Sequence, residues 1–123
     1  MYFVKIRESM MIAHSLPHPF FGPAQNVHGA TFVVDVTFKT ENVDEHNVVI
    51  DIGLAHTVVK ETLKTLDYQN LDDLEQFKGK LTTTEFVAKY VFDEITHKTK
   101  SFFKGKIGVC IKENPNAWAG FEE

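Results

Sequence analysis

The sequence has 123 residues, of which 43% are hydrophobic and 24% charged, and this ordinary composition predicts one globular domain over residues 1–123. Its net charge of −4, with lysines and arginines scattered along the chain, excludes the basic patch typical of nucleic-acid-binding proteins. The single cysteine excludes an internal disulfide, and without a signal-like segment or an apolar run of roughly 20 residues we expect a soluble cytoplasmic protein with no membrane partner.

Two strands are predicted in the first third of the chain. Residues 2–14 and 28–38 alternate between apolar and polar side chains, which is the pattern of a half-buried strand. Three prolines and a glycine between residues 16 and 27 predict a loop. Its length is greater than a tight hairpin needs, so we expect it to place residues over a site.

A helix is predicted in the middle of the chain. The apolar segment Val48–Asp51 leads into residues that repeat at helical spacing, and we expect this helix to end near Asp67. Residues 67–81 show no regular pattern and predict an irregular connection.

A second helix and a last strand follow. Thr82 and Glu85 have the spacing of a capping box, which predicts the start of the second helix. Residues 107–113 alternate as a strand that Asn114–Asn116 should stop, and residues 99–104 allow a further strand. This order of elements predicts an α+β fold, an antiparallel sheet carrying two helices on one face.

The most informative pattern is a pair of histidines, His14 and His28, at the two ends of the first loop. A His-x-His pair at the start of a strand can bind a metal ion from one side, because alternate side chains share a face. Here the second member of that pair is Ala30. Catalytic zinc has three protein ligands and a water, so the pattern indicates a zinc site with one ligand missing, which His18 could swing in to replace. The alternative is a pair of polar residues at strand ends that bind no metal.

Six motifs in order resemble the 6-pyruvoyl-tetrahydropterin synthase family, which includes the 6-carboxytetrahydropterin synthases of queuosine biosynthesis. They are Ala13-His14 with Leu16-Pro17-His18, His28-Gly29, Val49-Ile50-Asp51, Leu66-Asp67, Thr83-x-Glu85 and Glu113. The resemblance covers nearly the whole chain and implies the tunnelling fold (T-fold), a four-stranded antiparallel sheet with the order β-β-α-α-β-β. It also implies a homo-oligomer, a trimer or hexamer with sites between subunits, and such closure would remove the exposed edges of a small sheet.

The resemblance also implies the binding residues of a pterin site. His14 and His28 match two zinc ligands, and because the third position is Ala30, we expect any Zn2+ to be held weakly. Glu113 matches the carboxylate that anchors the pterin, which can accept hydrogen bonds from a ring N–H and the neighbouring amino group together. Thr83 matches a residue of the same pocket, although a helix N-cap would equally explain a threonine there.

The proton-transfer residues of the family are where this sequence departs most. The resemblance places the reactive cysteine at Ala24, and the family's Asp-His pair reads Asp67-Tyr68. A tyrosine titrates near pH 10, so it is a poorer base than histidine at neutral pH. Asp67 and Tyr68 remain the candidates for catalytic roles, while Cys110 is either a relocated nucleophile or an inert small hydrophobe.

Three functions stay open at this point. The first is a zinc-dependent carbon–oxygen lyase that acts on 7,8-dihydroneopterin triphosphate or a related pterin and expels triphosphate. The second is a non-catalytic or redirected homologue that binds a pterin or purine. The third is a structural subunit without a ligand. Since a fold hosts many functions, the geometry of the site has to decide among them.

Overall fold

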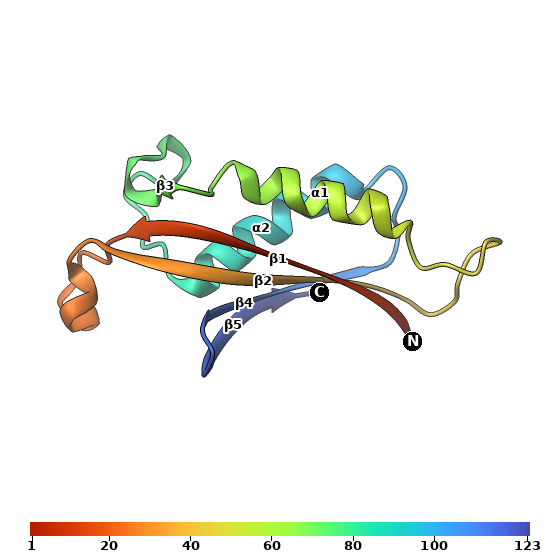
Figure 1. Cartoon of the computed structure of the whole chain (residues 1–123), viewed down its shortest axis with the longest axis horizontal. Coiled ribbons are helices and arrows are strands. Elements are labelled where there is room, and N and C mark those ends of the chain that lie inside the picture. Colours follow the sequence, from red (N-terminus) through yellow and green to blue (C-terminus); the bar gives the residue numbers. More distant parts are fainter.

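The computed structural model describes all residues from Met1 to Glu123 and confirms an antiparallel sheet with two helices on one face (Figure 1). The sheet order is β3-β1-β2-β4-β5, and only the short β3 pairs in parallel, with the end of β1. The strands are β1 (Tyr2–His14), β2 (His28–Thr40), β3 (Gln69–Asn70), β4 (Lys106–Asn114) and β5 (Ala117–Glu122).

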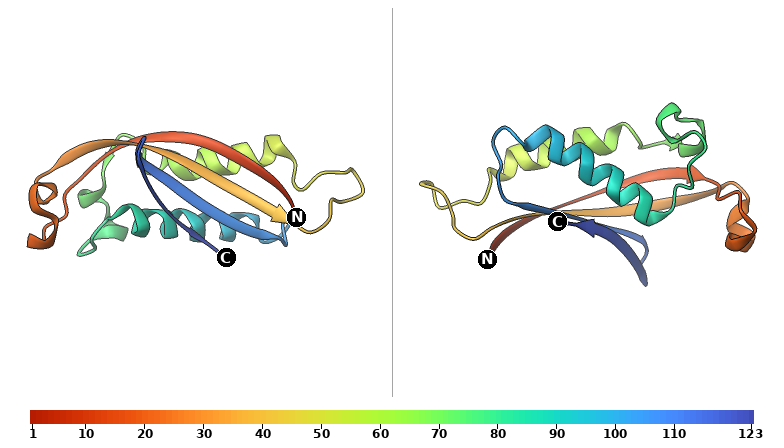
Figure 2. Two further views of the ribbon diagram at one scale, coloured as in Figure 1. Left: turned by 90° about the horizontal axis from the view of Figure 1, so that it is seen from below. Right: turned by 180° about the vertical axis from the view of Figure 1, so that it is seen from behind.

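Both helices, α1 (Ile52–Lys64) and α2 (Thr84–Thr99), lie across the same face of the sheet, and the opposite face carries none (Figures 1 and 2). Between the two layers lies a core of 24 buried residues. Alternate residues of β2 from Phe32 to Phe38 are 0% exposed, and each such side chain contributes about 1.5–3 kcal/mol by its burial. A one-residue slip would turn these side chains out of the core, so the register of β2 is strongly specified.

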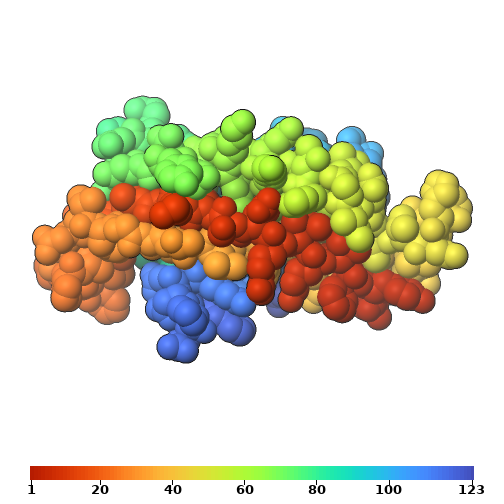
Figure 3. Space-filling view, in the orientation of Figure 1, coloured from red at the N-terminus to blue at the C-terminus, as the bar shows by residue number.

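The register of β1 and β2 places His14 directly opposite His28. Ala30 follows on the same face of β2, opposite Ile12. The loop between the strands contains short 3-10 turns at Pro19–Gln25 and protrudes beyond one end of the sheet (Figure 3). A hydrogen bond of 3.0 Å from Leu16 N–H to the Ala24 carbonyl closes this loop on itself.

One expectation about element boundaries is close and another is wrong. The first helix ends at Lys64, but hydrogen-bonded turns continue to Asp67, whose N–H donates to the Leu63 carbonyl at 2.9 Å, and the chain turns away at Tyr68 with a positive φ of 60°. Residues 99–104 form no strand, since the N–H groups of Phe102 and Phe103 both donate to the Thr99 carbonyl. The fourth long strand is instead β5, which follows the turn after Asn114 and completes the expected β-β-α-α-β-β order.

The sequence predicts no membrane-spanning segment. Neither α1 nor α2 combines the length and the apolar character that crossing a bilayer requires.

Candidate functional site

The end of β1 and the start of β2 bring the two predicted metal ligands together. The ring centroids of His14 and His28 are 4.6 Å apart, with the planes inclined at 65°. His14 Nδ1 lies 2.9 Å from the Thr82 carbonyl oxygen, and His28 Nδ1 lies 2.8 Å from the Asn26 carbonyl oxygen. A carbonyl only accepts, so each neutral ring carries its hydrogen on Nδ1 and keeps a lone pair on Nε2. This orientation by a carbonyl is typical of metal-binding histidines.

The surroundings of His14 keep its ring neutral. Burial lowers the pKa of His14 most, and the nearby His28 lowers it further. The bond to Thr82 and the charges of Asp72 and Glu113 oppose this shift without cancelling it. Two carboxylates therefore act on His14 from neighbouring segments, and its lone pair stays available at neutral pH.

A third metal ligand is lacking in this arrangement. Nowhere in the chain do three or more His, Cys, Asp or Glu side chains gather in a way that could hold a metal ion. His18 caps the 3-10 turn instead, with its Nδ1 accepting from Phe20 N–H at 3.1 Å, so its hydrogen is on Nε2. The two imidazoles can thus supply two of the three protein ligands that catalytic zinc usually has.

A cavity of about 540 Å³ opens between the loop, the start of α2 and the β4–β5 hairpin. Glu113 lies in its wall, and the Thr84 hydroxyl donates to Glu113 Oε1 at 3.1 Å. The residues lining the cavity are Leu16, Phe21, Ala24, Thr83, Thr84, Glu85, Glu113, Ala117, Trp118 and Ala119. The structure therefore brings Thr83 and Glu113 into one cavity, together with Ala24.

The expected capping box at Thr82 and Glu85 is wrong by one residue. Thr83 is the N-cap of α2, and its side chain accepts from Phe86 N–H at 3.1 Å. Glu85 becomes the second residue of the helix, and its side chain makes no hydrogen bond within the chain. Three consecutive threonines can each cap a helix, so spacing alone could not choose among them.

Sequence reasoning missed the roles of Thr82 and Thr84. Both the carbonyl oxygen and the Oγ1 of Thr82 contact His14 Nδ1, the Oγ1 at 3.0 Å. The Thr84 hydroxyl makes the hydrogen bond to Glu113. One segment at the start of α2 thus contacts both the histidine pair and the anchor carboxylate. The run of threonines was the available signal, but only the folded chain shows which partner each one meets.

Asp67 and Tyr68 hold a turn against β1 in this structure. Asp67 Oδ1 accepts from Met11 N–H at 2.8 Å, and Tyr68 N–H donates to the Met11 carbonyl at 2.7 Å. The Tyr68 side chain is 78% exposed, and neither residue lines the cavity of the same chain. Their catalytic roles remain a prediction that would require a neighbouring subunit.

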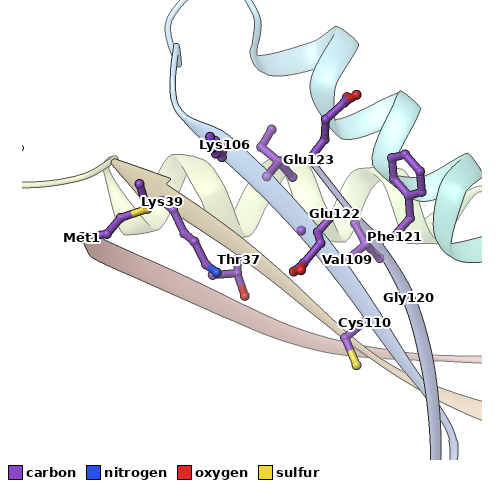
Figure 4. A pocket seen from close by; sticks show the side chains of 12 residues that line it. Met1, Thr37, Lys39, Lys106, Val109, Cys110, Gly120, Phe121, Glu122 and Glu123 are labelled. Carbon is purple, nitrogen blue, oxygen red and sulfur yellow. The ribbon is translucent and has the colours of Figure 1, made fainter. Parts of the chain in front are cut away.

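A larger cavity, of about 710 Å³, lies at the opposite end of the sheet (Figure 4). It is formed by the start of β1, the end of β2 and the β4–β5 pair, and no histidine lines it. Cys110 lines this cavity, and although it stands only three residues before Glu113 on β4, it does not line the cavity that contains Glu113.

Comparison with known proteins points to a single protein family. The family model for 6-pyruvoyl tetrahydropterin synthase matches residues 3–123. The chain is similar to a 6-pyruvoyl tetrahydrobiopterin synthase of Dictyostelium discoideum, at 29% identity over 67% of this chain and 62% of the relative. It is also similar to a 6-carboxy-5,6,7,8-tetrahydropterin synthase of Bacillus subtilis, at 28% identity over 76% of this chain and 66% of the relative. The match thus spans less than two thirds of these relatives.

Solved structures extend the likeness over the whole chain. A 6-pyruvoyl tetrahydropterin synthase structure of Caenorhabditis elegans superposes with a TM-score of 0.86 at 28% identity, covering 99% of this chain and 95% of that one. A Plasmodium falciparum structure has a TM-score of 0.80 at 17% identity, a likeness of fold alone. With the family match over residues 3–123, these findings show that the chain belongs to the 6-pyruvoyl tetrahydropterin synthase family and has its T-fold.

Proposed function

We propose that this protein binds a reduced pterin, 7,8-dihydroneopterin triphosphate or a related compound, in the cavity that Glu113 lines. The Thr84–Glu113 hydrogen bond of 3.1 Å is the observation that carries the proposal. It orients a carboxylate at the cavity wall and leaves most of its acceptor capacity free for a ring N–H and an amino group. A cavity of about 540 Å³ is of the size that holds a small bicyclic ligand.

In this proposal the bound pterin does not meet the family's usual catalytic base. Ala24 lines the cavity at the position where the resemblance places the family's reactive cysteine, and a methyl group transfers no proton. Asp67 and Tyr68 lie outside the cavity of their own chain and could join it only across a subunit contact. The pocket is thus kept while the usual base is replaced.

A second candidate, the zinc-dependent lyase, is favoured by the histidine pair. The rings of His14 and His28 lie with their centroids 4.6 Å apart, and each keeps a lone pair on Nε2. Together they would hold a Zn2+ ion, and the binding would be weak because Ala30 provides no third ligand. The ion would polarise a side-chain oxygen of the pterin. Asp67 and Tyr68 would then be contributed by a neighbour in a cytoplasmic homo-oligomer, a trimer or hexamer.

The test is a fluorescence titration with 7,8-dihydroneopterin triphosphate, followed by chromatography for triphosphate release. Glu113→Gln should weaken pterin binding by about 100-fold, since an amide presents one acceptor and one donor where the ligand offers two donors. Glu122→Gln, in the other cavity, is the matched control and should bind as the wild type does. Equal affinities for the wild type and Glu113→Gln would refute the proposal, and triphosphate release that depends on added zinc would favour the lyase.

A further inference from the structure

We infer, resting on the proposed function, that Glu85 is the proton acceptor for the side chain of the bound pterin. Only two of the residues that line the cavity carry a carboxyl group, Glu85 and Glu113. Glu113 already accepts from Thr84 and in the proposal also holds the pterin ring. Glu85 is the remaining base in the cavity of a single chain.

The local structure leaves the Glu85 carboxylate free for this task. In a capping box it would accept from the backbone of the residue before the helix, but α2 begins one residue too late for that. The Thr83 N–H donates instead to the Leu81 carbonyl at 2.9 Å, and Thr83 provides the cap by itself. Glu85 therefore has no capping role, and no hydrogen bond within the chain holds its exposed side chain.

The carboxylate of Glu85 lies at the end of α2 that attracts negative charge. Glu85 is the acidic residue in the first turn of α2, where the positive end of the helix dipole stabilises a negative charge. An ionised carboxylate is the form that accepts a proton. No other proton acceptor lines the loop side of the cavity, because the side chains of Leu16, Phe21 and Ala24 contain no basic group.

The proton comes from the side-chain carbon attached to the dihydropterin ring. The C=N bond of the ring acidifies this C–H, as a carbonyl group would. The C–H bond breaks and an O–H bond forms on Glu85. The electron pair forms a C=C bond to the ring, the π pair of the C=N bond moves to the ring nitrogen, and that nitrogen takes a proton from water. The step is a tautomerisation that needs no oxidant or reductant, and in D2O its reversal introduces deuterium at the carbon.

The experiment measures deuterium incorporation into 7,8-dihydroneopterin by mass spectrometry, with the protein in D2O and the pterin affinity measured in parallel. Glu85→Gln should slow exchange by about 100-fold or more, while the dissociation constant changes less than about threefold. Glu85→Asp should restore part of the rate, because it returns a carboxylate on a shorter side chain. Glu122→Gln is the control and should exchange as the wild type does.

Two outcomes overturn the inference. The first is equal exchange in the wild type and Glu85→Gln, and the second is wild-type exchange no faster than without protein. In either case, pterin binding that still depends on Glu113 would leave the proposed function standing. Failure of the wild type to bind the pterin would refute the proposed function itself.

Discussion

Replacing Thr84 with valine tests how the anchor carboxylate is oriented. Valine keeps the branched shape of this buried side chain, which is 6% exposed, and removes the hydroxyl that donates to Glu113 Oε1 at 3.1 Å. A hydrogen bond to a charged group contributes about 1.5–3 kcal/mol. Because Glu113 is exposed and water can replace the hydroxyl, we expect the low end of that range, which corresponds to about tenfold weaker pterin binding.

The assay is the fluorescence titration of the pterin, with thermal unfolding measured on the same samples. Thr83 caps α2 independently, so Thr84→Val should shift the melting temperature only slightly. Thr96→Val is the matched control on the same helix, since the Thr96 hydroxyl is buried without a hydrogen-bond partner and its loss should leave binding unchanged. Unchanged affinity in Thr84→Val beside weakened affinity in Glu113→Gln would show that the hydroxyl does not orient the carboxylate.

Three further predictions concern the metal, the acid stability and the close packing of the last hairpin. Ala30→His adds a third imidazole on the face of His28 and should strengthen Zn2+ binding by about 100-fold or more in competition with a chelating dye; equal affinities would contradict the proposed metal site. The hydrogen bond from Arg7 lowers the pKa of Asp35 below its ordinary value of 3.8, so its contribution to stability is complete above pH 3.8 and is lost as the pH falls through the lower folded-state pKa. The melting temperature of Asp35→Asn should fall less steeply with decreasing pH in that acid range than the melting temperature of the wild type. An equally steep fall in both proteins would contradict this role of Asp35. Gly120→Ala would force a Cβ against the Val109 carbonyl oxygen and should sharply lower the melting temperature; the comparison is Gly53→Ala in α1, where the nearest contact is 3.8 Å away and stability should rise by up to about 1 kcal/mol.

The sequence by itself determined the strands that hold the site. The alternation over residues 2–14 matches β1, and the alternation that starts at His28 matches the start of β2, because side-chain alternation is a local property of a half-buried strand. The order of motifs also identified the family. Ala24 and Ala30 could be named as departures from its pattern, since both follow from spacing along the chain.

Only the tertiary structure decided which groups meet at the site. The contact of Thr82 with His14 joins residues 68 apart in sequence, and that of Asp67 with Met11 joins residues 56 apart. Such pairs depend on how α2 and the segment before it pack against β1, which no local pattern specifies. For the same reason sequence spacing placed the cap of α2 at Thr82, whereas packing assigned the cap to Thr83 and left the side chain of Glu85 free at the cavity.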